Sequence, residues 1–241
     1  MSARFEELDW QSTPMGELTL RRRVDPSLEL EIYEVKLGDE YLMSSAFTVA
    51  EEALAELGLA MTSGEGLRVL VGGLGLGYTA IAALRDPRVA ALTVIDTLPA
   101  VIGWHERGLL PVSAQLTDDA RTRLVLDDFF AVMRAAPGGA GADDARWDAI
   151  LLDVDHSPRH QLNPSHSDLY TPSGMRSLAR HLVDGGVFAL WSDDPPDEDF
   201  LVTLRAVFAH ADAHVVDFAN PLTEGISSNT VYVARLDRVE A

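Results

Sequence analysis

The sequence predicts an α/β protein built on a doubly wound, mostly parallel, Rossmann-like sheet. Apolar runs typical of buried parallel strands alternate with helical segments over residues 67–191. A glycine-rich turn over 72–77 follows the first run, and Asp96 ends the second. Acidic residues also follow the later runs. Because ligands bind at the carboxyl ends of such strands, the turn and the acids predict a ligand site there.

The composition narrows the possible partners. The 241 residues include 38 acids against 19 Lys and Arg, a net charge of −19. Such a surface repels nucleic acid and anionic membranes and attracts cations, although solubility alone explains the excess equally well. No cysteine is present, so disulfides and thiolate metal sites are excluded. No signal-peptide core and no apolar run near the roughly 18 residues of a membrane span are found, and we expect a cytoplasmic location.

Residues 1–47 predict a small region of antiparallel strands, and residues 48–241 predict the main Rossmann-like domain. Apolar and polar residues alternate over 28–35, and shorter strands are expected over 17–21 and 40–43. The region is expected to pack on the main fold or to serve in dimerisation, and we expect a homodimer. Thr48 and Glu51 then fit a capping box that starts a helix to about Met61.

The glycine turn and Asp96 together predict a nucleotide-type βαβ unit. A strand over 67–71 leads into the pattern Gly73-x-Gly75-x-Gly77, a helix follows, and Asp96 ends the next strand. The glycine spacing is tighter than that of dinucleotide enzymes, which favours a nucleoside without pyrophosphate, such as S-adenosylmethionine. A carboxylate at Asp96 can accept hydrogen bonds from ribose hydroxyls. A plain tight turn is the alternative interpretation.

The remaining elements continue the alternation of strands and helices. They are predicted, in chain order, as a helix over 98–107, a strand over 123–126, a helix to 133, a strand over 147–152, a helix from 172 to about 183, a strand over 187–191, a helix over 197–210, and closing strands over 215–218 and 229–235. The stretch 109–119 is expected to be irregular.

Acids at the ends of the later strands supply candidates for binding and catalysis. Asp127 or Asp128 is placed to bind an adenine amino group. Asp153 and Asp155 are the catalytic candidates, because a carboxylate there can hold a protonated amine and accept its proton. Two acids so close also raise one another's pKa. Asp193 is a candidate substrate-binding residue.

The loop over 156–168 carries three histidines and is long enough to form a lid over the site. The spacings of His156, His160 and His166 match no metal-binding motif, so no metal is expected, and the histidines are interpreted as solvent-facing or substrate-gating. Tyr170, just after the loop, either lines the pocket as a substrate-binding residue or packs in the core.

From Leu67 to Trp191 the chain resembles spermidine synthases, the polyamine aminopropyltransferases built on the class I methyltransferase fold. The matching segments are VLVGGLGLG, LTVIDTLPAVIGWHERGLLP, LVLDDFFAVM, WDAILLDVDHSP and LYTPSGMRSLARHLVDGGVFAL. The resemblance implies that Asp96 binds the ribose of decarboxylated S-adenosylmethionine, that Asp128 contacts adenine, and that Asp153 is the base acting on the amine. It also makes Tyr170 a pocket residue.

The chain departs from the family pattern at three places. Gly75 stands where the family carries an acid that helps to hold the aminopropyl amine, and DVDHSP replaces a DSSDP-like loop. Only Glu51 and Glu52 fall near the family's N-terminal substrate motif, and Glu52 is taken as a candidate substrate-binding residue.

Three functions stay open on these grounds. The first is transfer of an aminopropyl group from decarboxylated S-adenosylmethionine to a small cationic amine, a step of polyamine biosynthesis. The second is methyl transfer from intact S-adenosylmethionine. The third is a catalytically inactive protein of the same fold that binds a nucleoside or dimerises.

Overall fold

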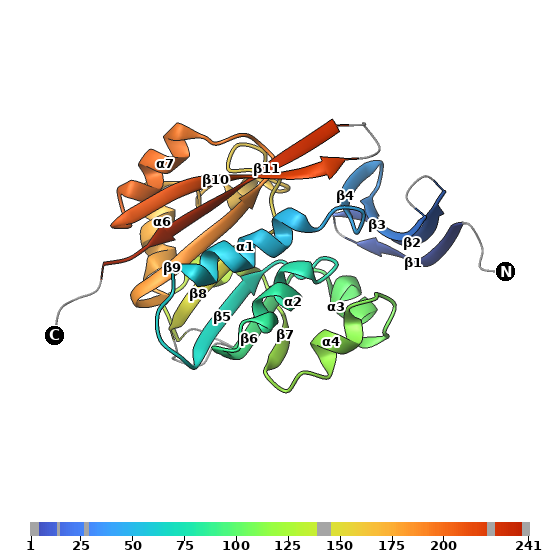
Figure 1. The fold of residues 1–241 in the computed structure, drawn as a ribbon, viewed down its shortest axis with the longest axis horizontal. Helices are drawn as coiled ribbons and strands as arrows, with labels where there is room; N and C mark the ends of the chain where they lie inside the picture. The colour runs from blue at the N-terminus through green and yellow to red at the C-terminus, as the bar shows by residue number, and fades with distance from the viewer. Residues whose placement is uncertain (1–4, 14, 27–28, 139–145, 221–224, 238–241) are drawn as a thin grey trace.

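The computed structural model describes residues 5–13, 15–26, 29–138, 146–220 and 225–237. Within them the strands form two sheets, one of four strands and one of seven. Figure 1 shows the four-stranded sheet at one end of the molecule, next to the glycine turn and away from the described C-terminal end.

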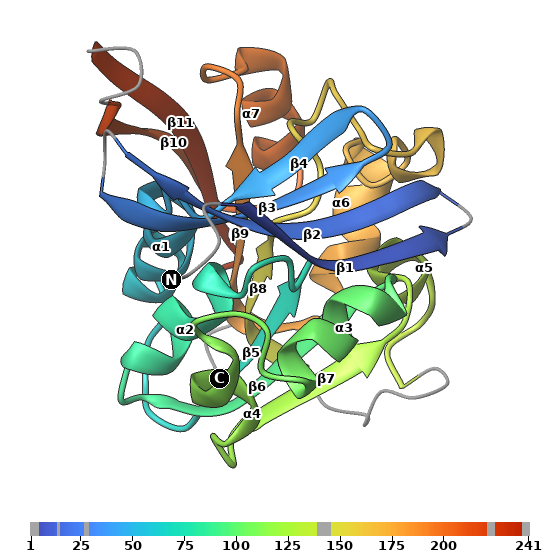
Figure 2. The same cartoon turned by 90° about the vertical axis from the view of Figure 1, so that its right-hand side faces the viewer.

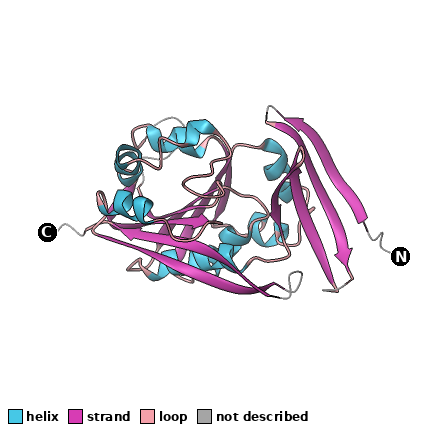
Figure 3. Cartoon of the chain, turned by 90° about the horizontal axis from the view of Figure 1, so that it is seen from above, coloured by secondary structure: helices cyan, strands magenta, loops and turns pink. Residues whose placement is uncertain are grey.

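The small sheet is antiparallel and runs in chain order, β1-β2-β3-β4. Its strands are β1 (Phe5–Thr13), β2 (Gly16–Asp25), β3 (Leu30–Leu37) and β4 (Glu40–Ser44). The last three match the predicted strands, and β1 is additional. Leu18, Leu20 and Val35 are buried in the same core as residues of the large sheet. The small sheet therefore packs tightly across one end of the molecule (Figures 2 and 3).

The large sheet confirms the predicted fold class. Its strand order is β10-β11-β9-β8-β5-β6-β7, and β6, β5, β8 and β9 run parallel to β7. The strands are β5 (Leu67–Gly72), β6 (Val89–Asp96), β7 (Thr122–Leu126), β8 (Trp147–Leu152), β9 (Leu182–Ser192), β10 (His210–Asn220) and β11 (Gly225–Arg235). The chain order reverses between β5 and β8, which makes that point the expected ligand crevice.

Helices cover both faces of the large sheet. On one face lie α1 (Val49–Ala60), α2 (Tyr78–Arg85), α3 (Pro99–Glu106) and α4 (Ser113–Thr117); on the other lie α5 (Phe129–Arg134), α6 (Pro172–Ala179) and α7 (Glu198–Arg205). Strand β5 shows why both faces are apolar. Val69 and Val71 enter the first core and Leu70 enters the second, because successive side chains of a strand alternate.

Several local predictions are wrong in detail. Thr48 makes no side-chain cap hydrogen bond to α1, so the capping box with Glu51 does not form; instead its Oγ1 donates to Glu52 Oε1 at 2.9 Å. Helix α6 ends at Ala179 rather than near 183, because β9 starts at Leu182 and carries the expected helix-ending glycines within it. The stretch expected to be irregular contains α4.

Across the described residues, no helix is both long and apolar enough to cross a membrane.

Candidate functional site

The glycine turn lies at the crevice between β5 and β8 and needs its glycines. Gly73, Gly75 and Gly77 have φ angles of +93°, +47° and +92°, in the region that disfavours other residues. A Cβ on Gly73 would lie 2.0 Å from the backbone oxygen of Asp153, so no side chain fits there. The turn is thus pressed against the end of β8, and a ligand on the turn also meets Asp153.

Two connected cavities open around this turn. The Asp96 lobe, of about 280 Å³, lies beside the ends of β6 and β7, and the Glu51 lobe, of about 470 Å³, lies beside the N-terminal half of α1 and the β10–β11 hairpin. Both are lined by the same five residues where they meet: Leu42, Met43, Gly75, Asp153 and Val154. A ligand bound in one lobe can therefore reach a ligand bound in the other.

The Asp96 lobe combines satisfied carboxylates with an apolar wall. Asp96 accepts hydrogen bonds from the backbone N–H of Leu74 at 3.0 Å and of Leu98 at 2.8 Å. Burial raises the pKa of Asp96, and these N–H groups oppose that rise. Asp128 caps α5 by accepting from the Ala131 N–H, and Phe129 lies beside it in the wall. The lobe suits a flat ring joined to a sugar diol, and its residues fit the adenosyl part of the expected donor.

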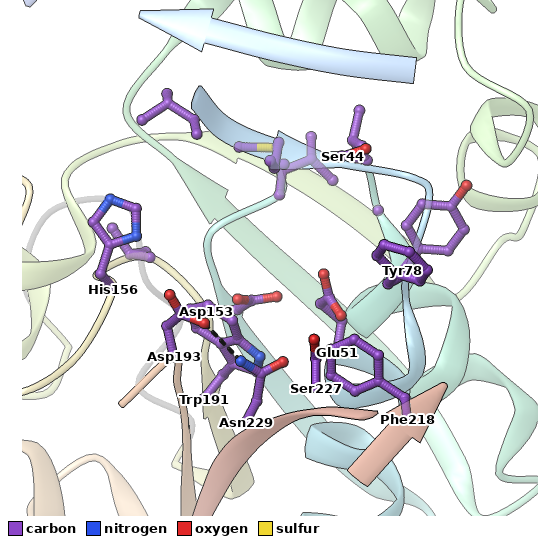
Figure 4. Close-up of a pocket in the computed structure, with 18 of the residues that line it drawn as sticks. Ser44, Glu51, Tyr78, Asp153, His156, Trp191, Asp193, Phe218, Ser227 and Asn229 are labelled. Atoms are coloured by element: carbon purple, nitrogen blue, oxygen red, sulfur yellow. Dashed lines mark hydrogen bonds between the residues drawn. The ribbon is translucent and has the colours of Figure 1, made fainter. Parts of the chain in front are cut away.

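The Glu51 lobe brings carboxyl groups together, and among the described residues no lysine or arginine lines it. The side chains of Glu51 and Asp153 point toward one another in Figure 4. The Thr79 hydroxyl donates to Asp153 Oδ2 at 2.6 Å. Burial raises the pKa of Glu51 to about 8, with the negative charge of Asp153 adding to the rise. Burial likewise raises the pKa of Asp153 to about 6, which the Thr79 hydrogen bond opposes.

The rest of the Glu51 lobe is polar and aromatic. Asn229 Nδ2 donates to Asp193 Oδ1 at 2.8 Å, which fixes a third carboxylate at the lobe (Figure 4). Tyr78, Trp191 and Phe218 line the same space. Aromatic faces and carboxylates both attract ammonium groups, so this lining is chemically suited to a small cation.

Four predicted site residues lie outside both lobes, and their placement is a correction. Asp155 is buried in the loop after β8, where it binds His166, Tyr170 and the Leu162 N–H. These partners hold the Asp155 carboxylate away from the lobes, so the expected pair of Asp153 and Asp155 does not form; the acid facing Asp153 is Glu51. Tyr170 is buried with its hydroxyl on Asp155 rather than in the site.

The other two corrections concern neighbours of true lining residues. Glu52 pairs with Arg85 and accepts a hydrogen bond from Thr48. Adjacent residues of a helix point roughly 100° apart, so Glu51, and not Glu52, faces the lobe. Asp127 binds the N–H of Asp128 and lines neither lobe.

Sequence reasoning missed several lining residues because they come from distant segments. Met43 comes from β4, and Phe218 and Asn229 come from the β10–β11 hairpin. No local pattern marks them. The place of Asn229 follows from the antiparallel pairing of β11 with β9, where Thr230 lies opposite Ser192 and brings Asn229 next to Asp193.

Among the described residues, no group of three or more His, Cys, Asp or Glu side chains is arranged to hold a metal ion. The three loop histidines are separated: His156 lines the Glu51 lobe, His166 lines the Asp96 lobe, and His160 is exposed beside Asp194.

No protein-family model matches the chain. Curated relatives named polyamine aminopropyltransferase, from Mycobacterium tuberculosis and Mycobacterium bovis, are 31% identical to it over 127 residues. The match covers 53% of this chain and 23% of the relative, so the chain spans less than a quarter of the length of these relatives.

Solved structures share the fold. A spermidine synthase in complex with the transition-state analogue AdoDATO has a TM-score of 0.70 at 18% identity, and covers 95% of this chain and 73% of its own. Spermidine synthase from Thermotoga maritima has a TM-score of 0.69 at 17% identity, and the match covers 95% of this chain and 72% of that structure. Human methyltransferase-like protein 13 in complex with SAH has a TM-score of 0.52 at 20% identity, and the match covers 80% of this chain and 83% of that structure. The sequence match and the shared fold confirm that the chain is similar to spermidine synthases and has a class I methyltransferase-type fold.

Proposed function

We propose that the protein is a spermidine synthase-like transferase that moves an aminopropyl group from decarboxylated S-adenosylmethionine to a small cationic amine. The observation that carries the proposal is the meeting of the two lobes at Asp153. The Asp96 lobe suits the adenosyl part of the donor, and the acidic Glu51 lobe suits the amine. The sequence match to polyamine aminopropyltransferases supports the same assignment.

Within this proposal the site residues have separate roles. Asp96 receives the ribose hydroxyls and Asp128 the adenine amino group. Gly73, Gly75 and Gly77 let the backbone approach the donor closely. Asp153 is the base, and Glu51 with Asp193 holds the positive charge of the acceptor. Asp155, Tyr170, Asp127 and Glu52 are not assigned a direct contact with either substrate.

The chemical step is an in-line displacement. The lone pair of the neutral acceptor amine attacks the carbon next to the sulfonium, a new C–N bond forms, and the C–S bond breaks with its electron pair returning to sulfur. Methylthioadenosine leaves and the product amine stays protonated, because Asp153 has already accepted the proton that the entering ammonium gave up before the attack. Most of the acceleration is expected from holding both substrates in line.

The raised pKa values fit a base in this lobe. A free alkylamine has a pKa near that of lysine, about 10.4, so it enters the lobe protonated. A carboxylate with a pKa of about 6 accepts a proton better than an ordinary aspartate, and it is still ionised at neutral pH. Before the amine binds, the neighbouring Glu51, with a pKa of about 8, is mostly protonated there, and the two acids titrate as a pair. A bound ammonium lowers the pKa of Glu51 and favours its ionised form, which holds the positive charge.

The junction of the lobes favours a second candidate, methyl transfer from intact S-adenosylmethionine. Gly75 lacks the acid that the family resemblance associates with the aminopropyl amine, and a Cβ on Gly75 would lie 3.0 Å from Met43 Sδ. Met43 thus fills the space beside this position. Without a carboxylate there, the carboxyl group of the intact donor meets less repulsion.

Titration calorimetry separates these functions. The protein is titrated with decarboxylated S-adenosylmethionine, S-adenosylmethionine and methylthioadenosine, and turnover is then assayed with putrescine and other small amines. The proposal expects preference for the decarboxylated donor and release of methylthioadenosine. Preference for the intact donor would support methyl transfer, and binding without turnover across the amines would support a non-catalytic nucleoside-binding protein.

A further inference from the structure

A buried carboxylate that the proposed reaction does not use orients a histidine beside the Asp96 lobe. Asp155 is 1% exposed. Its Oδ2 accepts from the Tyr170 hydroxyl at 2.7 Å, and its Oδ1 accepts from the Leu162 N–H at 2.8 Å. The same Oδ1 lies 2.8 Å from His166 Nδ1. A carboxylate only accepts hydrogen bonds, so this network assigns the hydrogen of the neutral imidazole to Nδ1.

The His166 ring is held by a second contact as well. It stacks on Phe130 with ring centroids 3.6 Å apart and planes 7° apart. The His166 side chain keeps 13% exposure and lines the Asp96 lobe together with Phe130. Within the part of the chain that the structure describes, no side chain or backbone group hydrogen-bonds to its Nε2. The ring therefore has a fixed orientation and one free acceptor nitrogen.

We propose that His166 is a specificity-determining residue that reads the base of the nucleoside in the Asp96 lobe and selects a 6-aminopurine over a 6-oxopurine. The inference rests on the proposed function for the presence of a nucleoside there. Nε2 accepts a hydrogen bond from the exocyclic amino group. Asp128 lines the same lobe, and an amino group carries two hydrogens, enough for both acceptors.

A 6-oxopurine does not complement the hydrogen-bonding groups of this arrangement. Its exocyclic oxygen is an acceptor and would face the acceptor nitrogen of His166 and the carboxylate of Asp128. Sites built to pair with a particular hydrogen-bonding group reject analogues that lack it, since the buried polar groups are then left unpaired. By fixing the orientation of the His166 ring, Asp155 thus contributes to the preference for a 6-aminopurine.

Calorimetry with methylthioadenosine and methylthioinosine tests this proposal. The native protein is expected to prefer methylthioadenosine. His166→Phe keeps a flat ring to stack on Phe130 but removes the acceptor. It is expected to weaken methylthioadenosine binding about tenfold, the scale of one hydrogen bond, and to leave methylthioinosine binding nearly unchanged. The matched control is Ser167→Ala, which alters an exposed residue next to His166 that lines neither lobe, and it should keep the native preference.

The other outcomes are decisive as well. If His166→Phe keeps the native preference, or if it weakens both nucleosides equally, His166 does not read the base. Imidazole ¹⁵N NMR of the native protein provides a test that needs no variant: the Nε2 resonance of His166 should shift on addition of methylthioadenosine. A bound nucleoside with no shift overturns this inference alone, whereas failure of the native protein to bind methylthioadenosine overturns the nucleoside site of the proposed function too.

Discussion

The two lobes of the site treat their carboxylates in opposite ways. In the Asp96 lobe, Asp96 accepts two backbone N–H groups and Asp128 accepts one from the first turn of α5. In the Glu51 lobe, Glu51 faces Asp153 with no lysine or arginine in the described part of the lining, and burial raises the pKa of both acids. Both kinds of acid follow or face the end of a parallel strand, yet those of the first lobe accept from backbone N–H groups, whereas Asp153 and Asp193 accept from the side chains of Thr79 and Asn229.

The difference indicates a division of labour. A lobe whose acids already have partners is organised before the ligand arrives, which favours recognition of a defined shape. A lobe with crowded acids gains most when a cation enters, because the cation removes the repulsion between them. In the first lobe the acids orient a ligand, and in the second they bind charge and move a proton.

The largest effect is expected from Asp153→Asn, which removes the proposed base. The rate of transfer should fall by about 10²–10⁴-fold, the usual contribution of a general base, while affinity for methylthioadenosine stays close to the native value. Steady-state kinetics and calorimetry on the same preparation measure both quantities.

Asp193→Asn is the matched control in the same lobe. It removes one charge and keeps a side chain beside Asn229, so it should raise KM for the amine more than it lowers kcat. Normal turnover in Asp153→Asn would remove Asp153 from the base role.

A smaller effect is expected from Asp96→Ala in the other lobe. Loss of hydrogen bonds from a charged acceptor, each about 1.5–3 kcal/mol, should weaken methylthioadenosine binding by about 10–100-fold. Calorimetry measures the change, and circular dichroism checks that the variant keeps its secondary structure without the contact of Asp96 to the Leu74 N–H.

Asp127→Ala gives the comparison for this variant. Asp127 also follows a parallel strand but lines neither lobe, so its removal should leave the affinity nearly unchanged. An unchanged affinity in Asp96→Ala would disprove the ribose assignment.

The sequence was sufficient to predict the large sheet and the Asp96 lobe because both follow from local patterns. Apolar runs define parallel strands, and their carboxyl ends must meet at one edge. Gly73, Gly75, Asp96, Asp128 and Asp153 all lie at the last residue of a strand or within three residues past it, and all line a lobe. The division into domains at residue 47, the homodimer and the cytoplasmic location stay predictions.

The Glu51 lobe was only partly predictable because long-range packing assembles it. The choice between Glu51 and Glu52 depends on the rotation of α1, which the pattern of apolar residues alone did not fix. Asp155 was assigned to catalysis because it lies two residues after Asp153, but its carboxylate is buried in a different network, with His166 and Tyr170. Met43 comes from β4 of the small sheet and Asn229 comes from β11 of the large sheet, and no short motif marks either residue.

The smallest effect concerns stability and gives the sharpest contrast between the lobes. Burial raises the pKa of Glu51 from 4.5 to about 8, so between these values the native state binds more protons than the unfolded state. Stability contributed by this group is therefore full below pH 4.5 and is lost as the pH rises toward 8. Glu51→Gln does not titrate and should raise Tm above pH 8 by about 2–4 °C for each kcal/mol recovered, with little change at pH 4.

Scanning calorimetry at pH 4 and pH 8.5 measures this difference, and Glu52→Gln is its control. Glu52 forms an ion pair with Arg85, so neutralising it should lower Tm slightly at pH 8.5, the opposite sign for the same change one residue away. At pH 8.5 a saturating cationic amine should raise the Tm of the native protein more than it raises the Tm of the Glu51→Gln variant. The cation relieves the repulsion between Glu51 and Asp153, which the variant has already lost. If Glu51→Gln instead lowers Tm equally at both pH values, Glu51 acts there as a hydrogen-bonding residue, and the charge contrast between the two lobes is lost.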